Sequence, residues 1–450
     1  MIPEGGQQPT DLLHDVVAAN RAGRPVGLTS VCSANRFVLE TVLRHAAGSH
    51  SLVCIESTSN QVNRSGGYTG MTAAAFRDEV AALAAAAGVP AARLLLGGDH
   101  LGPYPWRGLP ARAAMAHACE LVRSCVLAGY AKIHLDASMR CADDPGDEST
   151  ALDDGVIVER TVALCRTAEA ARAELPAGSP APLYVIGTEV PTPGGEEAGQ
   201  AGPSVTPAED VERTLDSTSE AFRKAGLADA WERVIAVVVQ PGVEFGDATV
   251  SAYERAAASG LSAFVERRPR LVYEAHSTDY QSAEALRQLV EDHFAILKVG
   301  PWLTFAFREA VFALEEIESH VLRGRPGAQP SRLRGVLDEV MVRHPEHWAA
   351  YYRGSPEEVR RKRAFSYSDR CRYYWPQPAV QEALAGLLRN LSERPIPAAL
   401  IDKLLPESSS AIREGRLPAE PVALIRHHIQ RVLDLYTAAC DDATKSPYHA

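Results

Sequence analysis

The sequence has no long apolar run and no closely spaced pair of cysteines. No segment approaches the ~18 continuous apolar residues that a transmembrane helix requires, and the N-terminus lacks the basic stretch and apolar core of a signal peptide. The 8 cysteines are scattered without a C-x-x-C spacing, which favours free thiols in a reducing compartment. We therefore expect a soluble cytoplasmic protein with no membrane association.

An excess of positive charge is also missing. The 46 Lys and Arg residues are outnumbered by 57 Asp and Glu residues, which gives a formal net charge of -11. A protein with this balance has no overall field that would hold a polyanion, so nucleic acid is not an expected partner. A phosphate-bearing ligand would have to be small and held by local backbone donors, a helix N-terminus or a cation.

The clearest pattern that is present is an alternation of short apolar runs with longer helical segments. Eight runs are predicted as strands: 26–31, 52–57, 93–97, 131–135, 183–187, 234–240, 271–275 and 294–299. The segments predicted as helices between them are 36–47, 73–87, 112–128, 155–173, 207–225, 250–267 and 281–291. Eight β-then-α units predict an α/β fold, a closed (β/α)8 TIM barrel, in preference to an open doubly wound sheet.

A Gly- and Pro-rich break at 323–330 divides the chain. We predict the barrel over 1–322 and a strand-poor helical extension over 331–450, packed on the barrel or on a neighbouring subunit. The extension contains an aromatic cluster made of Tyr367, Tyr373, Tyr374 and Trp375. These side chains serve either for packing or as a lid over the active site.

Polar residues follow every predicted strand, at the end of a barrel where catalytic groups are found. The segments are 30–35 (SVCSAN), 55–63 (IESTSNQVN), 97–103 (GGDHLGP), 134–138 (HLDAS), 187–197 (GTEVPTPGGEE), 240–246 (QPGVEFG), 274–280 (EAHSTDY) and 298–301 (KVGP). One polar residue after a buried strand is commonplace, but eight such segments in succession indicate a site. We expect Glu56 and Asn60, from the second segment, to contact a substrate.

These residue types suit a divalent cation. Imidazoles from different strands together with one carboxylate form a typical set of zinc ligands, and we predict His100, Glu189 and His276 for this role. Manganese, cobalt and nickel are also compatible with such a site. The cation would polarise a ketose carbonyl and stabilise the enediolate formed when a base removes a proton.

Asp99 is the predicted catalytic base, because its neighbour His100 would hold it beside the metal. Glu196, or the adjacent Glu197, would relay protons to the leaving or accepting oxygen. Asp136 either takes a direct part in catalysis or orients its neighbours, and His134 would share its face of the strand and line the barrel. The sequence contains no HExxH helix, GxSxG elbow or Walker loop.

Several longer motifs carry a family resemblance. They are SVCSAN, IESTSNQVNRSGGYTGMT, LGGDHLGP, KIHLDASM, VIGTEVPTPGGE, VVQPGVEF, YEAHSTDYQ, HFAILKVGP and SDRCRYYWP. With these motifs the chain resembles the GatZ/KbaZ family, the so-called non-catalytic subunits of class II D-tagatose-1,6-bisphosphate aldolase. The resemblance implies a TIM barrel distantly similar to the catalytic class II aldolases. In those aldolases an Asp-His pair follows the third strand, as Asp99 and His100 do here, and a glutamate ligand follows the fifth, as Glu189 does.

The same resemblance also exposes departures from the catalytic enzymes. The aldolases place a further ligand histidine after the sixth strand, where this chain has Gln240, which we predict to contact substrate. Their Gly-Gly-Ser-Gly phosphate loop after the seventh strand is replaced by HSTDY. The candidates for the missing phosphate contacts are Ser277, Thr278, Lys298 and Gly300.

Three functions remain open at this level. The resemblance implies an accessory subunit that stabilises a separate class II aldolase in carbohydrate catabolism. The ionisable residues favour a stand-alone, metal-dependent C4 epimerase or aldolase that acts on a ketohexose or its phosphate and interconverts tagatose and fructose forms. A sugar-phosphate kinase, a label sometimes attached to this family, is disfavoured because no ATP phosphate loop is present. A homo-oligomer is expected in each case.

Overall fold

A closed barrel of parallel strands forms the centre of the molecule. The computed structural model describes residues 7–146, 152–187 and 203–441. The strands of the barrel follow one another in the order β1-β10-β9-β6-β5-β4-β3-β2. Their bounds are β1 Leu28–Cys32, β2 Val53–Thr58, β3 Leu94–Leu101, β4 Lys132–Leu135, β5 Leu183–Gly187, β6 Val234–Val238, β9 Val272–Ala275 and β10 Ile296–Val299. The predicted TIM barrel is confirmed.

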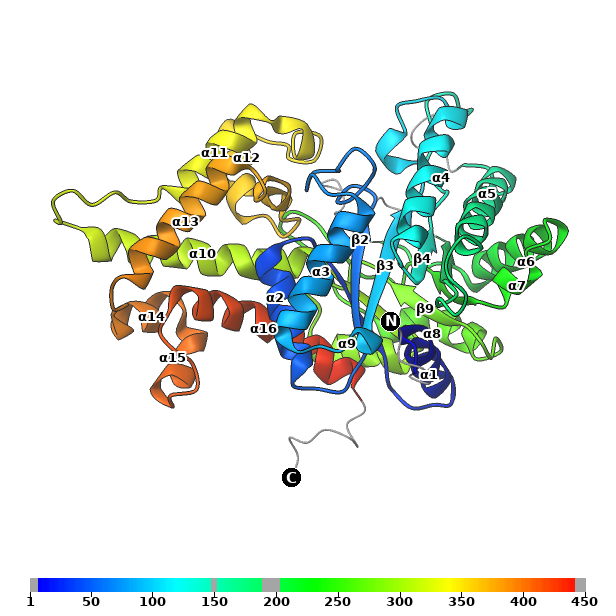
Figure 1. The fold of residues 1–450 in the computed structure, drawn as a ribbon, viewed down its shortest axis with the longest axis horizontal. Helices are drawn as coiled ribbons and strands as arrows, with labels where there is room; N and C mark the ends of the chain where they lie inside the picture. Colours follow the sequence, from blue (N-terminus) through cyan, green and yellow to red (C-terminus); the bar gives the residue numbers. More distant parts are fainter. Residues whose placement is uncertain (1–6, 147–151, 188–202, 442–450) are drawn as a thin grey trace.

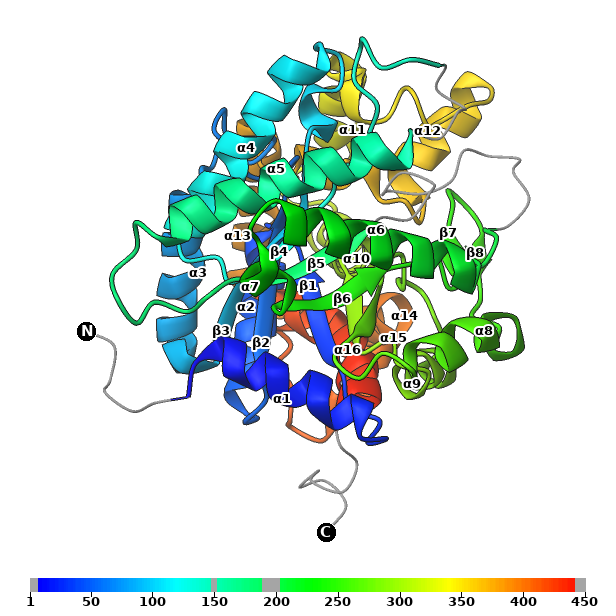
Figure 2. The same ribbon diagram turned by 90° about the vertical axis from the view of Figure 1, so that its right-hand side faces the viewer.

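Helices surround the barrel on its outer side (Figures 1 and 2). Their bounds are α2 Arg36–Ala47, α3 Ala73–Ala87, α4 Ala111–Leu127, α5 Asp154–Arg172, α6 Ala208–Lys224, α7 Ala228–Trp231, α8 Arg255–Val265, α9 Ala283–Glu291 and α10 Pro301–Leu322. Local sequence fixes several of the ends. Thr72 caps α3 through a bond from the Ala75 amide, and Gly88 ends that helix in the left-handed conformation at φ 80°.

The helix predicted over 250–267 is wrong at its start. Residues Glu244–Phe245 (β7) and Val250–Ser251 (β8) form a small antiparallel hairpin, and α8 begins only at Arg255. Glu244 and Phe245 are buried in this hairpin, and the ring of Phe245 packs edge-on against Tyr280 at 5.3 Å. Tertiary packing of the hairpin therefore overrides the local helical pattern.

The N-terminal end of the barrel is closed by α1 (Pro9–Arg21). Its buried Leu13 and Val17 pack with an apolar layer that includes Leu28, Leu95 and Ile296 from the barrel strands. Figure 2 shows α1 crossing that end of the barrel. Polar side chains are thereby left to the opposite end, where the strands finish.

The C-terminal extension consists of helices as predicted. Its elements are α11 Leu333–Arg343, α12 Pro356–Phe365, the 3-10 helix η4 Arg370–Tyr374, α13 Pro378–Ser392, α14 Ala398–Leu404, α15 Pro406–Arg413 and α16 Pro421–Cys440. In Figure 1, α11 and α12 lie toward the end of the barrel to which the β2 arrow points. Of the aromatic cluster, Trp375 packs edge-on against Phe307 of α10, whereas Tyr373 lines the cavity described below.

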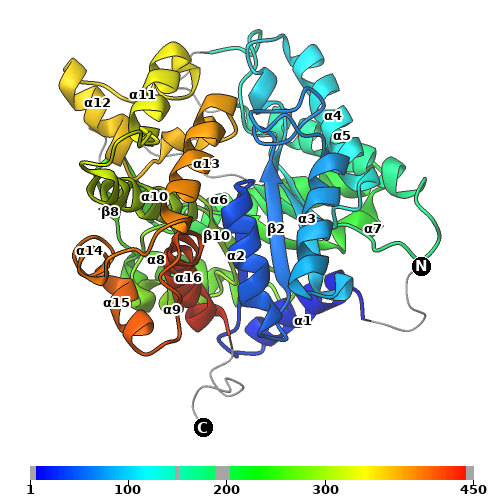
Figure 3. The same ribbon diagram turned by 60° about the vertical axis from the view of Figure 1, so that its left-hand side comes forward.

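The last helix, α16, occupies a place in the outer ring of the barrel. It packs against α2, α9 and α10, and Figure 3 shows it beside α2. The Gly27 amide, just before β1, donates to the Cys440 carbonyl at 2.8 Å, and the Tyr436 hydroxyl donates to the Thr278 carbonyl at 2.9 Å. None of the described helices is long and apolar enough to cross a membrane.

Candidate metal and catalytic site

A chain of alternating charges runs through the interior of the barrel. Lys132 Nζ lies 2.6 Å from Glu56 Oε1 and 2.6 Å from Glu274 Oε2, and all three side chains are completely buried. Lys298 Nζ contacts Oε2, the second carboxylate oxygen of Glu56, and lies 2.9 Å from Asp99 Oδ2. Charges inside a protein are tolerated only when they are paired in this way. The chain of ion pairs therefore leads from the barrel core to Asp99.

The pKa values in this chain follow from the pairing. Burial alone would raise the pKa of the Glu274 carboxyl, but Lys132 and His276 outweigh it and hold that pKa well below its usual range. Burial would lower the pKa of Lys132 and of Lys298, but the neighbouring carboxylates raise both. Glu274, Lys132 and Lys298 are thus held in their charged forms.

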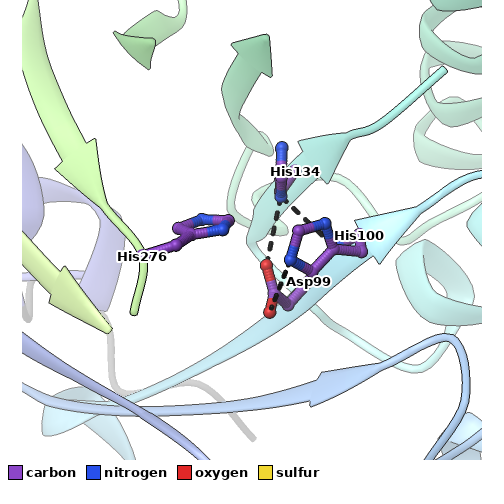
Figure 4. A group of neighbouring side chains, drawn as sticks. All are labelled: Asp99, His100, His134 and His276. Atoms are coloured by element: carbon purple, nitrogen blue, oxygen red, sulfur yellow. Dashed lines mark hydrogen bonds and ion pairs between the residues drawn. The ribbon is translucent and has the colours of Figure 1, made fainter. Parts of the chain in front are cut away.

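Above these ion pairs, four potential metal ligands come together at the mouth of the barrel. Asp99, His100, His134 and His276 each offer one ligand atom, and these atoms all lie within 4.8 Å of one another. Figure 4 shows the four side chains converging, with Asp99 and His100 on β3, His134 on the adjacent β4, and His276 after the more distant β9. All four are buried. Three imidazoles and a carboxylate form a donor set that suits zinc and related divalent cations.

Each imidazole is anchored through its outer nitrogen. His100 Nδ1 lies 2.8 Å from Asp136 Oδ2, and His276 Nε2 lies 3.0 Å from Glu274 Oε1. His134 Nε2 lies 2.9 Å from the Gly187 carbonyl, which makes this nitrogen the donor. Histidines that bind metals characteristically donate their second N–H to a carboxylate or carbonyl, which fixes the ring and its tautomer. The site has this outer layer already in place.

A distortion of β3 allows Asp99 and His100 to act together. Neighbouring residues of a regular strand point to opposite faces of the sheet. Here the register between β3 and β4 shifts between Gly98 and Leu101, and His100 has a φ of 48°. Positive φ is costly for a non-glycine residue and is concentrated at functional sites. The irregularity brings both side chains to one cluster.

The electrostatics of the cluster favour an ionised Asp99. Burial would raise the Asp99 pKa, but His100, Lys298 and His134 outweigh it and hold the pKa well below the usual range. Burial lowers the pKa of His134, but the hydrogen bond and charge of Asp99 raise it overall. Burial lowers the pKa of His276 to about 4, so this ring is neutral at physiological pH.

The cluster opens into a cavity of about 120 Å³ at the mouth of the barrel. A single water needs roughly 10–15 Å³ of accessible volume, so the cavity has room for roughly ten waters. Eight predicted site residues line it: Asn60, Asp99, His100, Asp136, His276, Ser277, Lys298 and Gly300.

The sequence from residue 13 to 441 matches the family model described as D-tagatose-1,6-bisphosphate aldolase subunit GatZ/KbaZ-like. The chain belongs to this family. It is 47% identical over 432 residues to a D-tagatose-1,6-bisphosphate aldolase subunit GatZ from Klebsiella pneumoniae, covering 96% of this chain and 100% of that protein. A crystal structure described as a probable tagatose 6 phosphate kinase from Sinorhizobium meliloti superposes with a TM-score of 0.83 at 43% identity. It covers 92% of this chain and 100% of its own.

Three further predicted residues of this GatZ/KbaZ-like chain lie outside the cavity. Glu56 lies beneath it, in the chain of ion pairs. Gln240 Oε1 accepts a bond from the Gly242 amide at 2.8 Å and so braces the turn after β6. The Thr278 hydroxyl donates to the Lys298 carbonyl at 2.6 Å and is fully buried. The predicted ligand Glu189 and the predicted relay Glu196 lie outside the described residues.

The site also contains residues that the sequence patterns did not single out. His134 was expected to line the barrel but not to join the cluster, and Lys132 and Glu274 were not given roles. A signal was available, because Lys132 and His134 alternate along β4, and Glu274 and His276 have the same spacing at the end of β9. Alternation places each pair on one face of its strand. Tyr373, from the aromatic cluster for which a lid over the site was one of two alternatives, lines the cavity together with Arg372, which no local pattern marks.

Proposed function

We propose that this chain is a metal-dependent enzyme that breaks and re-forms the C3–C4 bond of a ketohexose or ketohexose phosphate, as a C4 epimerase or aldolase. The observation that carries the proposal is the cluster of Asp99, His100, His134 and His276, of which Asp99, His100 and His276 line the cavity and His134 lies buried behind them. A barrel that served only as a scaffold would have no physical reason to keep three buried imidazoles and a buried carboxylate together.

The residues fit a divalent cation. His100 would bind through Nε2 and His276 through Nδ1, since Asp136 and Glu274 hold the other nitrogens. His134 would bind through Nδ1 in exchange for the bond that this atom accepts from the His100 amide at 3.2 Å, and Asp99 offers a carboxylate oxygen. Zinc suits these donors best, while manganese, cobalt and nickel are compatible. When bound, the cation would polarise the ketose carbonyl and lower the pKa of a neighbouring hydroxyl.

The chain's own groups supply the proton transfer. Asp99, held ionised and beside the cavity, would take the proton of the C4 hydroxyl. The C3–C4 bond then breaks, and its electron pair passes into the carbonyl to give an enediolate and an aldehyde. Lys298, 2.9 Å from Asp99, orients the carboxylate.

The outcome depends on how the two fragments recombine. If the aldehyde turns and the enediolate adds to its other face, Asp99 returns the proton to the C4 oxygen and the product is the C4 epimer. If the fragments separate and the enediolate takes up a proton at C3, the product is that of aldol cleavage. Both results use the same bond and the same base.

A second candidate is a supporting role in a larger aldolase. The Klebsiella relative is called an aldolase subunit, which favours assembly of this chain with a separate class II aldolase chain. In that case the chain would raise the activity or stability of the partner without turnover of its own.

The decisive experiment uses the purified chain alone. Its bound metal is measured by mass spectrometry, and C4 epimerisation and aldol cleavage are followed for fructose, tagatose and their phosphates. His100→Ala and Asp99→Asn are expected to lower turnover at least ~100-fold. The matched control is His14→Ala, because His14 is exposed on α1 at the other end of the barrel. A metal-free chain that is inactive alone but stabilises an added class II aldolase would refute the enzyme and support the subunit.

A further inference from the structure

One wall of the cavity comes from the C-terminal extension. The 3-10 helix η4 contributes Arg372 and Tyr373 to the lining, together with residues that come from the ends of barrel strands. The segment is anchored to α10, because Asp369 Oδ1 lies 2.8 Å from the Arg308 guanidinium of that helix. The Tyr280 hydroxyl also donates to the Tyr367 carbonyl at 2.6 Å. Arg372 is thus a fixed part of the site.

The Arg372 guanidinium is hydrogen-bonded to neutral oxygens, and the carboxylates of Asp369 and Asp279 act on it only over a distance longer than that of an ion pair. The guanidinium donates to the Ser368 carbonyl, to the Asp369 carbonyl at 3.2 Å and to the Tyr373 hydroxyl at 3.0 Å, all of which are neutral acceptors. Within 7–146, 152–187 and 203–441, no carboxylate oxygen forms an ion pair with it. The other cation of the cavity, Lys298, is matched by Glu56 and Asp99.

The usual place for a phosphate in such barrels is already occupied by the chain itself. TIM barrels commonly bind phosphate between the loops after the seventh and eighth strands and a helix N-terminus. Here Asp279, after β9, accepts bonds from the Gly300 amide at 3.1 Å and the Trp302 amide at 2.7 Å, at the start of α10. The carboxylate takes the donors that a phosphate would use. An anionic ligand must therefore be held at another wall.

We propose that Arg372 is the anchor for an anionic substituent on the sugar, either a phosphate monoester or a carboxylate. This inference rests on the proposed function, and it narrows the substrate to a charged ketose. The guanidinium matches the oxygens of both anions with paired N–H groups. Asn60 lines the same cavity, and its side-chain amide forms no hydrogen bond within the described part of the chain, so it is a second available donor.

The test is direct binding, measured by calorimetry on the purified full-length chain. The probes are fructose, fructose 6-phosphate, a keto-uronate and inorganic phosphate. The wild-type chain is expected to bind an anionic sugar more tightly than fructose. Whichever of fructose 6-phosphate and the keto-uronate binds more tightly identifies the anion. Arg372→Gln should weaken binding of that sugar by about 10- to 100-fold, because a hydrogen-bonded charge partner is lost. Fructose affinity should stay unchanged.

Two further variants keep the result interpretable. Arg361→Gln removes an exposed arginine of the same extension, on α12, and should leave all affinities unchanged. Arg372→Lys keeps the charge without the planar fork and should give an intermediate loss. Equal weakening of fructose and the anionic sugar, or no preference of the wild type for either anion, would overturn the anchor. Because binding is measured without turnover, an inactive chain with Arg372-dependent anion binding would count against the proposed reaction alone.

Discussion

Replacement of Arg308 by methionine removes the cation that ties the extension to the barrel. The guanidinium lies 2.8 Å from Asp369 Oδ1, and the two side chains are 2% and 0% exposed. Methionine keeps most of the apolar stem, so the loss is mainly that of the charge. Breaking a buried pair by removing one partner costs about 3–5 kcal/mol, since the other charge stays buried. Near 60 °C the unfolding entropy of 450 residues is about 0.9 kcal/mol/K, so the melting temperature should fall by about 3–5 °C.

The pH dependence separates charge from packing. Burial already raises the pKa of Asp369 above its ordinary value, even with Arg308 beside it. A carboxyl whose pKa is raised by folding favours the folded state only at low pH, and stability is lost as pH rises through the folded pKa. Without Arg308 the pKa rises further. The fall in melting temperature caused by Arg308→Met should therefore be larger at pH 8 than at pH 5. A loss of packing would lower the melting temperature equally at both pH values.

Calorimetric melting of three proteins tests this reasoning: the wild type, Arg308→Met and the double variant Arg308→Met/Asp369→Asn. The double variant should recover at least half of the loss, because the buried charge is gone. Asparagine also tolerates the left-handed backbone of residue 369, at φ 44°. A single variant that melts within 1 °C of the wild type at pH 8, or a deficit independent of pH with no recovery in the double variant, would refute the argument.

Three further outcomes are expected. Asp136→Asn should lower metal affinity by about 10- to 100-fold in a competition with a chromogenic chelator, because the carboxylate that orients His100 is lost; an unchanged affinity would contradict the outer-layer role. Gly97→Ala should cost about 1–3 kcal/mol in denaturant unfolding, since a Cβ there would lie 2.6 Å from Glu56 Oε1. Gly260→Ala, which meets open space on α8, should instead be neutral or stabilising. Removal of metal by a chelator should lower the melting temperature by about 3 °C relative to zinc at 100 times its Kd, and added zinc should restore it.

The barrel could be predicted because its strands are local and buried. The run predicted as a strand over 294–299 contains β10, Ile296–Val299, and the run over 183–187 coincides with β5. Parallel strands that are covered on both faces give continuous apolar runs, which stand out from helical periodicity. The hairpin of β7 and β8 has strands of two residues, which are too short to show any period.

The site was predictable in its residue types but not in its arrangement. The polar segments after the strands located Asp99, His100 and His276, since all strands of a barrel end at the same mouth. The positive φ of His100 depends on pairing with β4 and has no signature in the sequence. Arg372 reaches the cavity from a segment more than 250 residues after Asp99 and His100 in the sequence. Its placement depends on tertiary contacts alone.

The position of α16 delays completion of the barrel until long after its last strand has been made. This helix, Pro421–Cys440, fills the outer ring between α9 and α2, and α2 is made almost 400 residues earlier. While the chain is still emerging from the ribosome, the apolar faces of β1, α2 and α9 that α16 covers have no native neighbour. Closing such a distant contact is slow, and exposed apolar surface promotes aggregation in the meantime. A stalled or truncated nascent chain of this protein would therefore be a natural client for chaperones, even with every strand of its barrel already made.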